Sequence, residues 1–64
     1  MTDEEHLWVC ALEVERQHGT SAFLFASMRA DALLAEGAFE GARVWRAILE
    51  RIEMLEQAPS TPVN

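Results

Sequence analysis

The sequence predicts an all-α protein, organised as a small three-helix bundle in which an N-terminal helix packs on an αα-hairpin. Apolar residues recur at intervals of three and four, which is the repeat of one face of an α-helix. Gly19 and Gly37 interrupt this pattern, and glycine supplies the left-handed backbone that ends many helices. Loops this short force consecutive helices to lie antiparallel, so we expect either an up-down-up bundle or an αα-hairpin with the first helix laid across it.

The length of 64 residues allows a single domain, which we place at residues 1–57. The remaining residues, 58–64, contain two prolines and no apolar periodicity, and we expect a flexible tail. A core of this size rarely supplies more than about 3–5 kcal/mol of net stability. Cys10 is the only cysteine, so no disulfide can form within the monomer and the thiol is expected to act as a small hydrophobe. Association with another chain is therefore the expected source of further stability.

The first helix is expected over residues 3–18. Thr2 and Glu5 have the spacing of a capping box, in which each side chain bonds a free backbone N–H of the other residue. Acidic residues in the first turn also suit the positive end of the helix dipole. The expected core-facing line consists of Leu7, Ala11, Val14 and His18, widened by Trp8, Cys10 and Leu12.

The second helix is expected over residues 21–36, with Thr20 or Ser21 as its N-cap. Its core-facing line is expected to consist of Phe23, Ala26, Ala30 and Leu33. Phe25 and Met28 lie off this line. We therefore predict that they form an exposed apolar patch.

The third helix is expected over residues 39–57 and has the longest uninterrupted helical pattern. Its seam consists of Gly41, Trp45, Ile48, Ile52 and Leu55. A glycine one turn before Trp45 suggests that another helix crosses there and that the indole covers the crossing. On the opposite side, Arg46 and Glu50 have the spacing of an i,i+4 ion pair.

Positions spread over about residues 7–56 carry a resemblance to a known family. They are Ala11, Leu12, His18, Gly19, Ala22, Arg29, Leu33, Gly37, Gly41, Trp45, Ile48, Ile52 and Leu55. This pattern resembles a family of short alphaproteobacterial proteins of unknown function. In that family an acidic residue often follows each loop glycine, whereas Thr20 and Ala38 stand at those positions here. The resemblance implies a helical cytoplasmic protein and no particular activity.

A second resemblance lies at the junction of the second and third helices. Gly37, Phe39 and Ala42 resemble the turn between the two helices of a tetratricopeptide repeat. Trp45 falls one position short of the aromatic residue of the repeat's second helix, and an array needs about three units. The resemblance implies only that these two helices form a hairpin of that shape.

Two pairs of residues have metal-ligand spacing. Glu15 and His18 match the Glu-x-x-His motif of di-iron bundles, but those sites need a second motif and two further inward glutamates. His6 and Cys10 lie one turn apart, whereas zinc needs three or four ligands. We expect neither pair to bind a metal, and we predict no cofactor, no catalytic residue and no enzymatic activity.

The formal net charge of −6 argues against direct binding of nucleic acid, whose phosphates attract Lys and Arg. The N-terminal residues lack the positive charge and apolar run of a signal peptide. No apolar stretch approaches the roughly 20 residues that cross a bilayer. We therefore expect a cytoplasmic protein that does not bind membranes.

The leading functional prediction is a helical protein–protein interaction module, either a homo-oligomer or a subunit that docks on a larger bacterial protein. The predicted contact residues are Trp8, Val9, Phe25 and Met28. The alternative is a small acidic inhibitor or antitoxin-like protein that occupies a basic, nucleic-acid-binding surface of its target. The acidic face for that role would consist of Glu4, Glu5, Glu13 and Glu15.

Overall fold

The structure, a computed structural model, describes residues 3–57, and all but residues 36–38 of this segment are helical. The elements are α1 (Asp3–His18), a 3₁₀ turn η1 (Gly19–Ser21), α2 (Ala22–Ala35) and α3 (Phe39–Gln57). No strand occurs among the described residues, so the predicted all-α class is confirmed. The predicted capping residue Thr2 and the predicted tail of residues 58–64 lie outside the described part.

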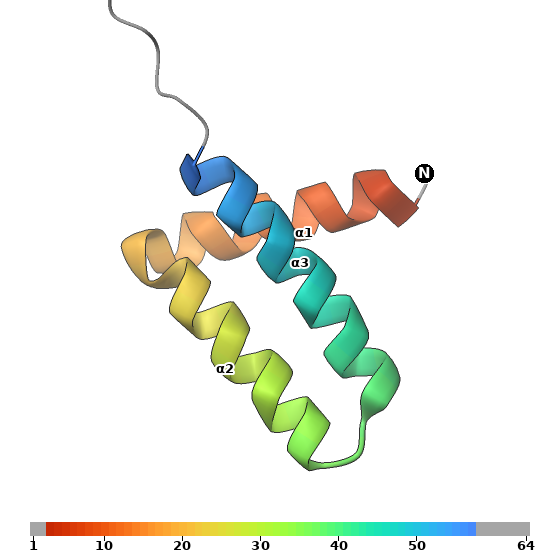
Figure 1. The fold of residues 1–64 in the computed structure, drawn as a ribbon. Helices are drawn as coiled ribbons and strands as arrows, with labels where there is room; N and C mark the ends of the chain where they lie inside the picture. Colours follow the sequence, from red (N-terminus) through yellow and green to blue (C-terminus); the bar gives the residue numbers. More distant parts are fainter. Residues whose placement is uncertain (1–2, 58–64) are drawn as a thin grey trace, which may run out of the picture.

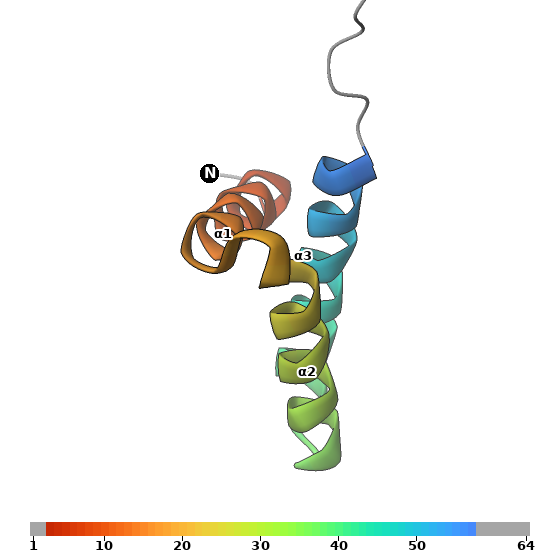
Figure 2. The ribbon, with the colours of Figure 1, turned by 90° about the vertical axis from the view of Figure 1, so that its left-hand side faces the viewer.

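The helices α2 and α3 lie side by side and antiparallel, and α1 crosses one face of this hairpin near the end away from the α2–α3 turn (Figures 1 and 2). The helical backbone continues from α1 through η1 into α2 without a loop. These elements can therefore also be described as one bent helix followed by α3. The expected separation of the chain into three independent helices is not confirmed.

Both interrupting glycines adopt the left-handed backbone that the sequence predicts. Gly19 has φ 57° and Gly37 has φ 83°. At the end of α2, Ala38 N–H donates to the Leu33 carbonyl at 2.9 Å and Gly37 N–H donates to the Leu34 carbonyl at 3.0 Å. This pair of bonds is the Schellman arrangement, which satisfies carbonyls at the C-terminal end of the helix.

The predicted side-chain cap of α2 is wrong. Ser21 precedes α2 but its side chain makes no capping hydrogen bond. The reason is the continuous helical backbone: the N–H of Ala22 donates to the carbonyl of Gly19 within η1. A backbone carbonyl thus satisfies a donor that a separate helix would leave for a side chain.

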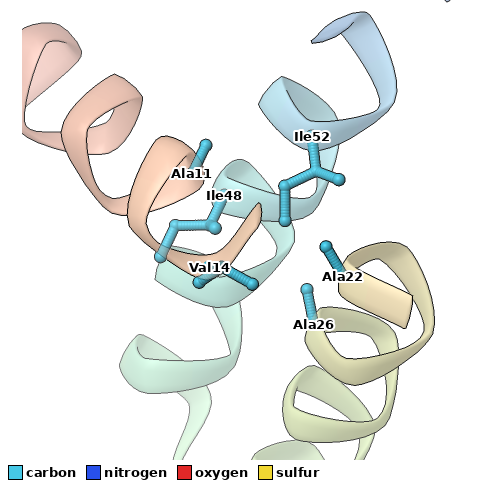
Figure 3. Packing of buried hydrophobic residues seen from close by; sticks show 6 residues of the cluster. All are labelled: Ala11, Val14, Ala22, Ala26, Ile48 and Ile52. Atoms are coloured by element: carbon cyan, nitrogen blue, oxygen red, sulfur yellow. The ribbon is translucent and has the colours of Figure 1, made fainter. Parts of the chain in front are cut away.

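The core lies where α1 crosses the hairpin, and alanine supplies half of the residues in its buried cluster (Figure 3). The buried apolar residues are Ala11, Val14, Ala22, Ala26, Ala30, Ala42, Ile48 and Ile52. Two residues expected in the core are instead exposed: Leu12 by 54% and Phe23 by 39%. Small side chains allow the helix backbones to approach closely, and the larger side chains beside them then remain at the surface.

The predicted seam of α3 is fully buried at its centre and only partly buried towards its ends. Ile48 and Ile52 are buried, whereas Gly41, Trp45 and Leu55 are half-buried. At Gly41 a Cβ atom would lie 3.4 Å from Cδ1 of Leu33. The Leu33 side chain of α2 therefore packs over this glycine, so a neighbouring helix does pass close to it.

Candidate interaction surfaces

Trp8, a predicted contact residue, is held between α1 and α3. Its indole N–H donates to Glu4 Oε2 at 2.8 Å, and the guanidinium carbon of Arg51 lies 5.9 Å from the ring centroid. Arg51 also bonds Glu4 Oε1 at 2.6 Å. Trp8 is half-buried as a result, and it contributes to attaching α1 to α3.

Arg51 is the residue of this cluster that the sequence reasoning missed. Its side chain is only 14% exposed, and it also donates to the Ala47 carbonyl at 3.2 Å. Its hydrogen bond to Glu4, followed by that of Trp8, lowers the pKa of the Glu4 carboxyl. No spacing rule connects residues 47 positions apart, so only the crossing of α1 over α3 reveals this pair.

Glu50, which the sequence pairs with Arg46, lies instead 3.7 Å from Arg51. That contact joins residues adjacent in sequence at a distance too long for a hydrogen bond, so it contributes little to stability. The i,i+4 spacing alone therefore selected the wrong partner for Glu50.

Phe25, the second predicted aromatic contact, makes internal ring contacts although it is 36% exposed. Its ring stacks on His18 with centroids 3.9 Å apart. It also meets the Trp45 ring edge-on, with centroids 5.8 Å apart. Phe25 thus joins the end of α1 to α2 and α3, and most of one ring face is already in use.

Val9 and Met28, the other two predicted contact residues, are exposed by 55% and 61%. The structure does not gather the four residues into one cluster. Trp8 lies beside Arg51, whereas Phe25 packs on His18 at the far end of α1. At 1.5 Å per residue, Trp8 and His18 are separated by about 15 Å along the helix.

The four glutamates of the predicted acidic face differ in their surroundings. Glu13 accepts bonds from Arg16 at 2.6 Å and Gln17 at 2.7 Å. These bonds, that of Arg16 first, lower the pKa of Glu13 to about 2. Glu4 bonds Arg51 and Trp8, Glu5 is exposed, and Glu15 is half-buried. Glu4 and Glu13 therefore have arginine partners within the chain.

The metal-ligand pairs gain no further ligands from the fold. Within residues 3–57, no three His, Cys, Asp or Glu side chains lie close enough together to hold a metal ion. His18 is stacked on Phe25. Glu15 instead lines a hollow of about 450 Å³ with Gly19, Thr20 and Glu56. Cys10 is a half-buried free thiol.

Large apolar side chains are common on the surface of the described segment. They are Val9, Leu12, Phe23, Leu24, Phe25, Met28, Leu34, Phe39, Val44 and Met54. Two of them, Leu34 and Phe39, line a hollow of about 530 Å³ near the α2–α3 turn, which we name the tip hollow. The other residues of the tip hollow are Ala42, Arg43, Arg46, Ala47 and Glu50.

A third hollow, of about 430 Å³, lies between the start of α1 and α3. We name it the α1–α3 hollow. Its α1 side consists of Asp3, His6 and Leu7, and its α3 side of Arg43, Val44 and Ala47. It shares Arg43 and Ala47 with the tip hollow, so the two form one continuous surface over α3. Sequence periodicity could not indicate this surface, because it depends on where α1 crosses α3.

Comparison with protein families assigns this sequence to a family. The family of unknown function DUF6961 matches residues 2–60. The chain belongs to this family. The match agrees with the resemblance to a family of uncharacterised proteins noted above.

No curated protein and no solved structure matches the chain. The described part of the chain contains no helix with both the length and the apolar character needed to cross a membrane.

Proposed function

We propose that this chain is a non-enzymatic helical interaction module that self-associates through its apolar helix surface. The observation that supports this is the distribution of apolar side chains. Alanine supplies most of the buried residues, while Phe, Leu, Met and Val side chains remain at the surface. Fully burying a large apolar side chain contributes about 1.5–3 kcal/mol, so covering several of them stabilises a complex substantially.

In this proposal α1 is the third helix of a small bundle and rests on the α2–α3 hairpin. The Glu4–Arg51 pair and the His18–Phe25 stack hold it there. The module would act in the cytoplasm of a bacterium. Val9 and Met28 remain candidate contact residues because their side chains are largely exposed.

The first test is the mass in solution, measured by light scattering after size exclusion at several micromolar concentrations and at two salt concentrations. A monomer has a mass of 7.2 kDa. We expect a dimer whose affinity changes little with salt, because apolar burial is hardly screened by ions. A monomer at every concentration would contradict self-association.

The alternative is an acidic inhibitor that binds a basic, nucleic-acid-binding surface of another protein. The net charge of −6 favours it, while the internal partners of Glu4 and Glu13 reduce the free negative charge of α1. Such a complex should weaken steeply with salt, because it depends on exposed charges. Reversing the charge at Glu15 should weaken that complex and leave self-association unchanged.

A further inference from the structure

We propose that the α1–α3 hollow is the surface through which two copies of this chain meet across a two-fold axis. This inference rests on the self-association proposed above and assigns it to particular residues. It differs from the contact surface predicted from the sequence, since none of Trp8, Val9, Phe25 and Met28 lines this hollow.

The floor of the hollow is apolar. Leu7 lies at its α1 side and also packs against the core. Val44 and Ala47 lie at its α3 side, and Val44 is 45% exposed. Its α3 side continues through Ala47 into the tip hollow, where Leu34 and Phe39 are exposed. The apolar surface available to a partner therefore extends along much of α3.

The charges around this floor are complementary to those of a second copy. Asp3 comes from α1 and Arg43 from α3, so opposite charges stand on opposite sides of the hollow. Within residues 3–57, neither side chain forms an ion pair.

A two-fold interface brings residue i of one copy to residue j of the other, and residue j of the first to residue i of the second. Around an axis through the hollow, Asp3 of each copy would face Arg43 of the other, and the apolar floors would meet between the two pairs. A patch with an apolar centre, an acid at one edge and an arginine at the other is thus self-complementary. That is the reason to assign it to a second copy of this chain.

The first experiment compares Val44→Glu with Met54→Glu by sedimentation equilibrium. Both residues lie on α3 and both are largely exposed, so neither change buries a charge in the monomer, and Met54 lines neither hollow over α3. Because a two-fold interface contains each residue twice, we expect Val44→Glu to raise the dimer Kd about tenfold or more. Met54→Glu should leave the Kd within about twofold, because its surroundings stay solvated. Circular dichroism should give the same helix content for both variants.

The second experiment exchanges the rim charges. Asp3→Arg alone places two arginines together at both contacts, and Arg43→Asp alone places two acids together. Each variant should therefore dimerise about tenfold or more weakly. An equimolar mixture should form heterodimers, because both contacts of a mixed pair then join opposite charges. One contact pairs the two introduced residues, and the other pairs the two original ones. Repulsion inside one chain is the same in the mixture, so recovery of dimers requires contact between chains.

The outcomes separate this surface from self-association in general. A wild-type chain that is monomeric throughout overturns both proposals. A dimer that tolerates Val44→Glu and whose rim variants show no recovery on mixing overturns the α1–α3 hollow alone. If Met28→Glu then dissociates that dimer, self-association uses the exposed face of α2. Selective loss with Val44→Glu together with recovery on mixing supports the hollow.

Discussion

Gly41 and Gly37 lie only four residues apart, yet their backbones differ in kind. Gly37 has φ 83°, a left-handed conformation that closes α2. Gly41 lies inside α3 with an ordinary helical backbone, and its nearest neighbour is the flexible end of the Leu33 side chain. Glycine is therefore required by the backbone at position 37 and only permitted at position 41.

This difference predicts opposite effects of the same substitution. Gly41→Ala should raise the free energy of unfolding by up to about 1 kcal/mol, since alanine favours the helix and its methyl group would contact Leu33. Gly37→Ala should lower the free energy of unfolding by about 1–2 kcal/mol, because an L-residue is strained in left-handed backbone. Urea unfolding followed by circular dichroism measures both changes. If Gly41→Ala destabilised the chain instead, Leu33 would be packed too tightly to move.

The residues that sequence reasoning placed correctly are those governed by local rules. Ala11, Val14, Ile48 and Ile52 are buried as their helical spacing predicts. Leu12 and Phe23 were misplaced because a helical pattern gives the width of an apolar band but not how much of it the neighbours can cover. Alanine at the contact points brings the helices close together, and the flanking large side chains then have no partner.

At the scale of the element, α1 is attached to the rest of the fold at both of its ends. Near its start, Glu4 and Trp8 contact Arg51, and at its end His18 stacks on Phe25. Between these points the contact is made by small apolar residues such as Ala11. The attachment of the first two turns therefore depends on an ionised carboxylate.

This dependence predicts that acid loosens the start of α1. The folded-state pKa of Glu4 is lowered from 4.5, so its contribution to stability is present above about pH 4.5 and is lost as the pH falls through that lowered value. Hydrogen exchange at pH 5 and below pH 3 should show a larger loss of protection in the first two turns of α1 than in α2. Glu4→Gln should remove this difference.

Glu53→Gln, an exposed carboxylate substitution on α3, serves as the matched control and should leave the pH dependence of α1 unchanged. Glu13 has a pKa of about 2, so its own contribution is lost between about pH 4.5 and 2. Because its partners are Arg16 and Gln17 on the same helix, that loss should affect the C-terminal part of α1 and not its attachment to α3. An unchanged exchange profile in Glu4→Gln would show that Arg51 does not hold α1.

The order of elements follows from helical periodicity and two glycines, but their relative placement does not. The sequence indicates where α1 and α3 form, and nothing in it states that residue 4 meets residue 51. The continuous backbone at η1 was also unpredictable, because Thr20 and Ser21 are good capping residues whose side chains are not used here. The angle at which two helices cross depends on the packing between them, and the periodicity within one helix does not determine that packing.

For the whole molecule, self-association predicts that stability depends on concentration. A dimer of folded chains is favoured by mass action, so the Tm should rise with total protein concentration. Thermal unfolding over a hundredfold range of concentration measures this shift. In Val44→Glu the Tm should become nearly independent of concentration, whereas Met54→Glu should behave as the wild-type chain. A Tm that stays constant in the wild-type chain would indicate a folded monomer.

The candidate site could be predicted only in part from the sequence, because it depends on how the helices pack against one another. An excess of apolar residues indicated that some would remain exposed, and Val9 and Met28 are indeed exposed. Trp8 and Phe25 are large side chains beside the core-facing lines of their helices, which suggests contact residues. In the structure, however, Trp8 bonds Glu4 and Phe25 stacks on His18. The α1–α3 hollow joins the start of α1 to the first half of α3, which lie far apart in the sequence, so no local pattern could reveal it.

The alanine core also bears on how sequences with this fold can diverge. A methyl group fits at positions 11, 22, 26, 30 and 42, where helices touch, and a larger side chain would push them apart. These sites should therefore tolerate little beyond alanine, glycine or serine. The surface positions have no such steric limit, and an apolar side chain that persists there among related chains would point to selection by a binding partner. In a comparison of family sequences, small residues conserved at the buried positions would then indicate a packing constraint. Apolar residues conserved at the surface would indicate a binding constraint.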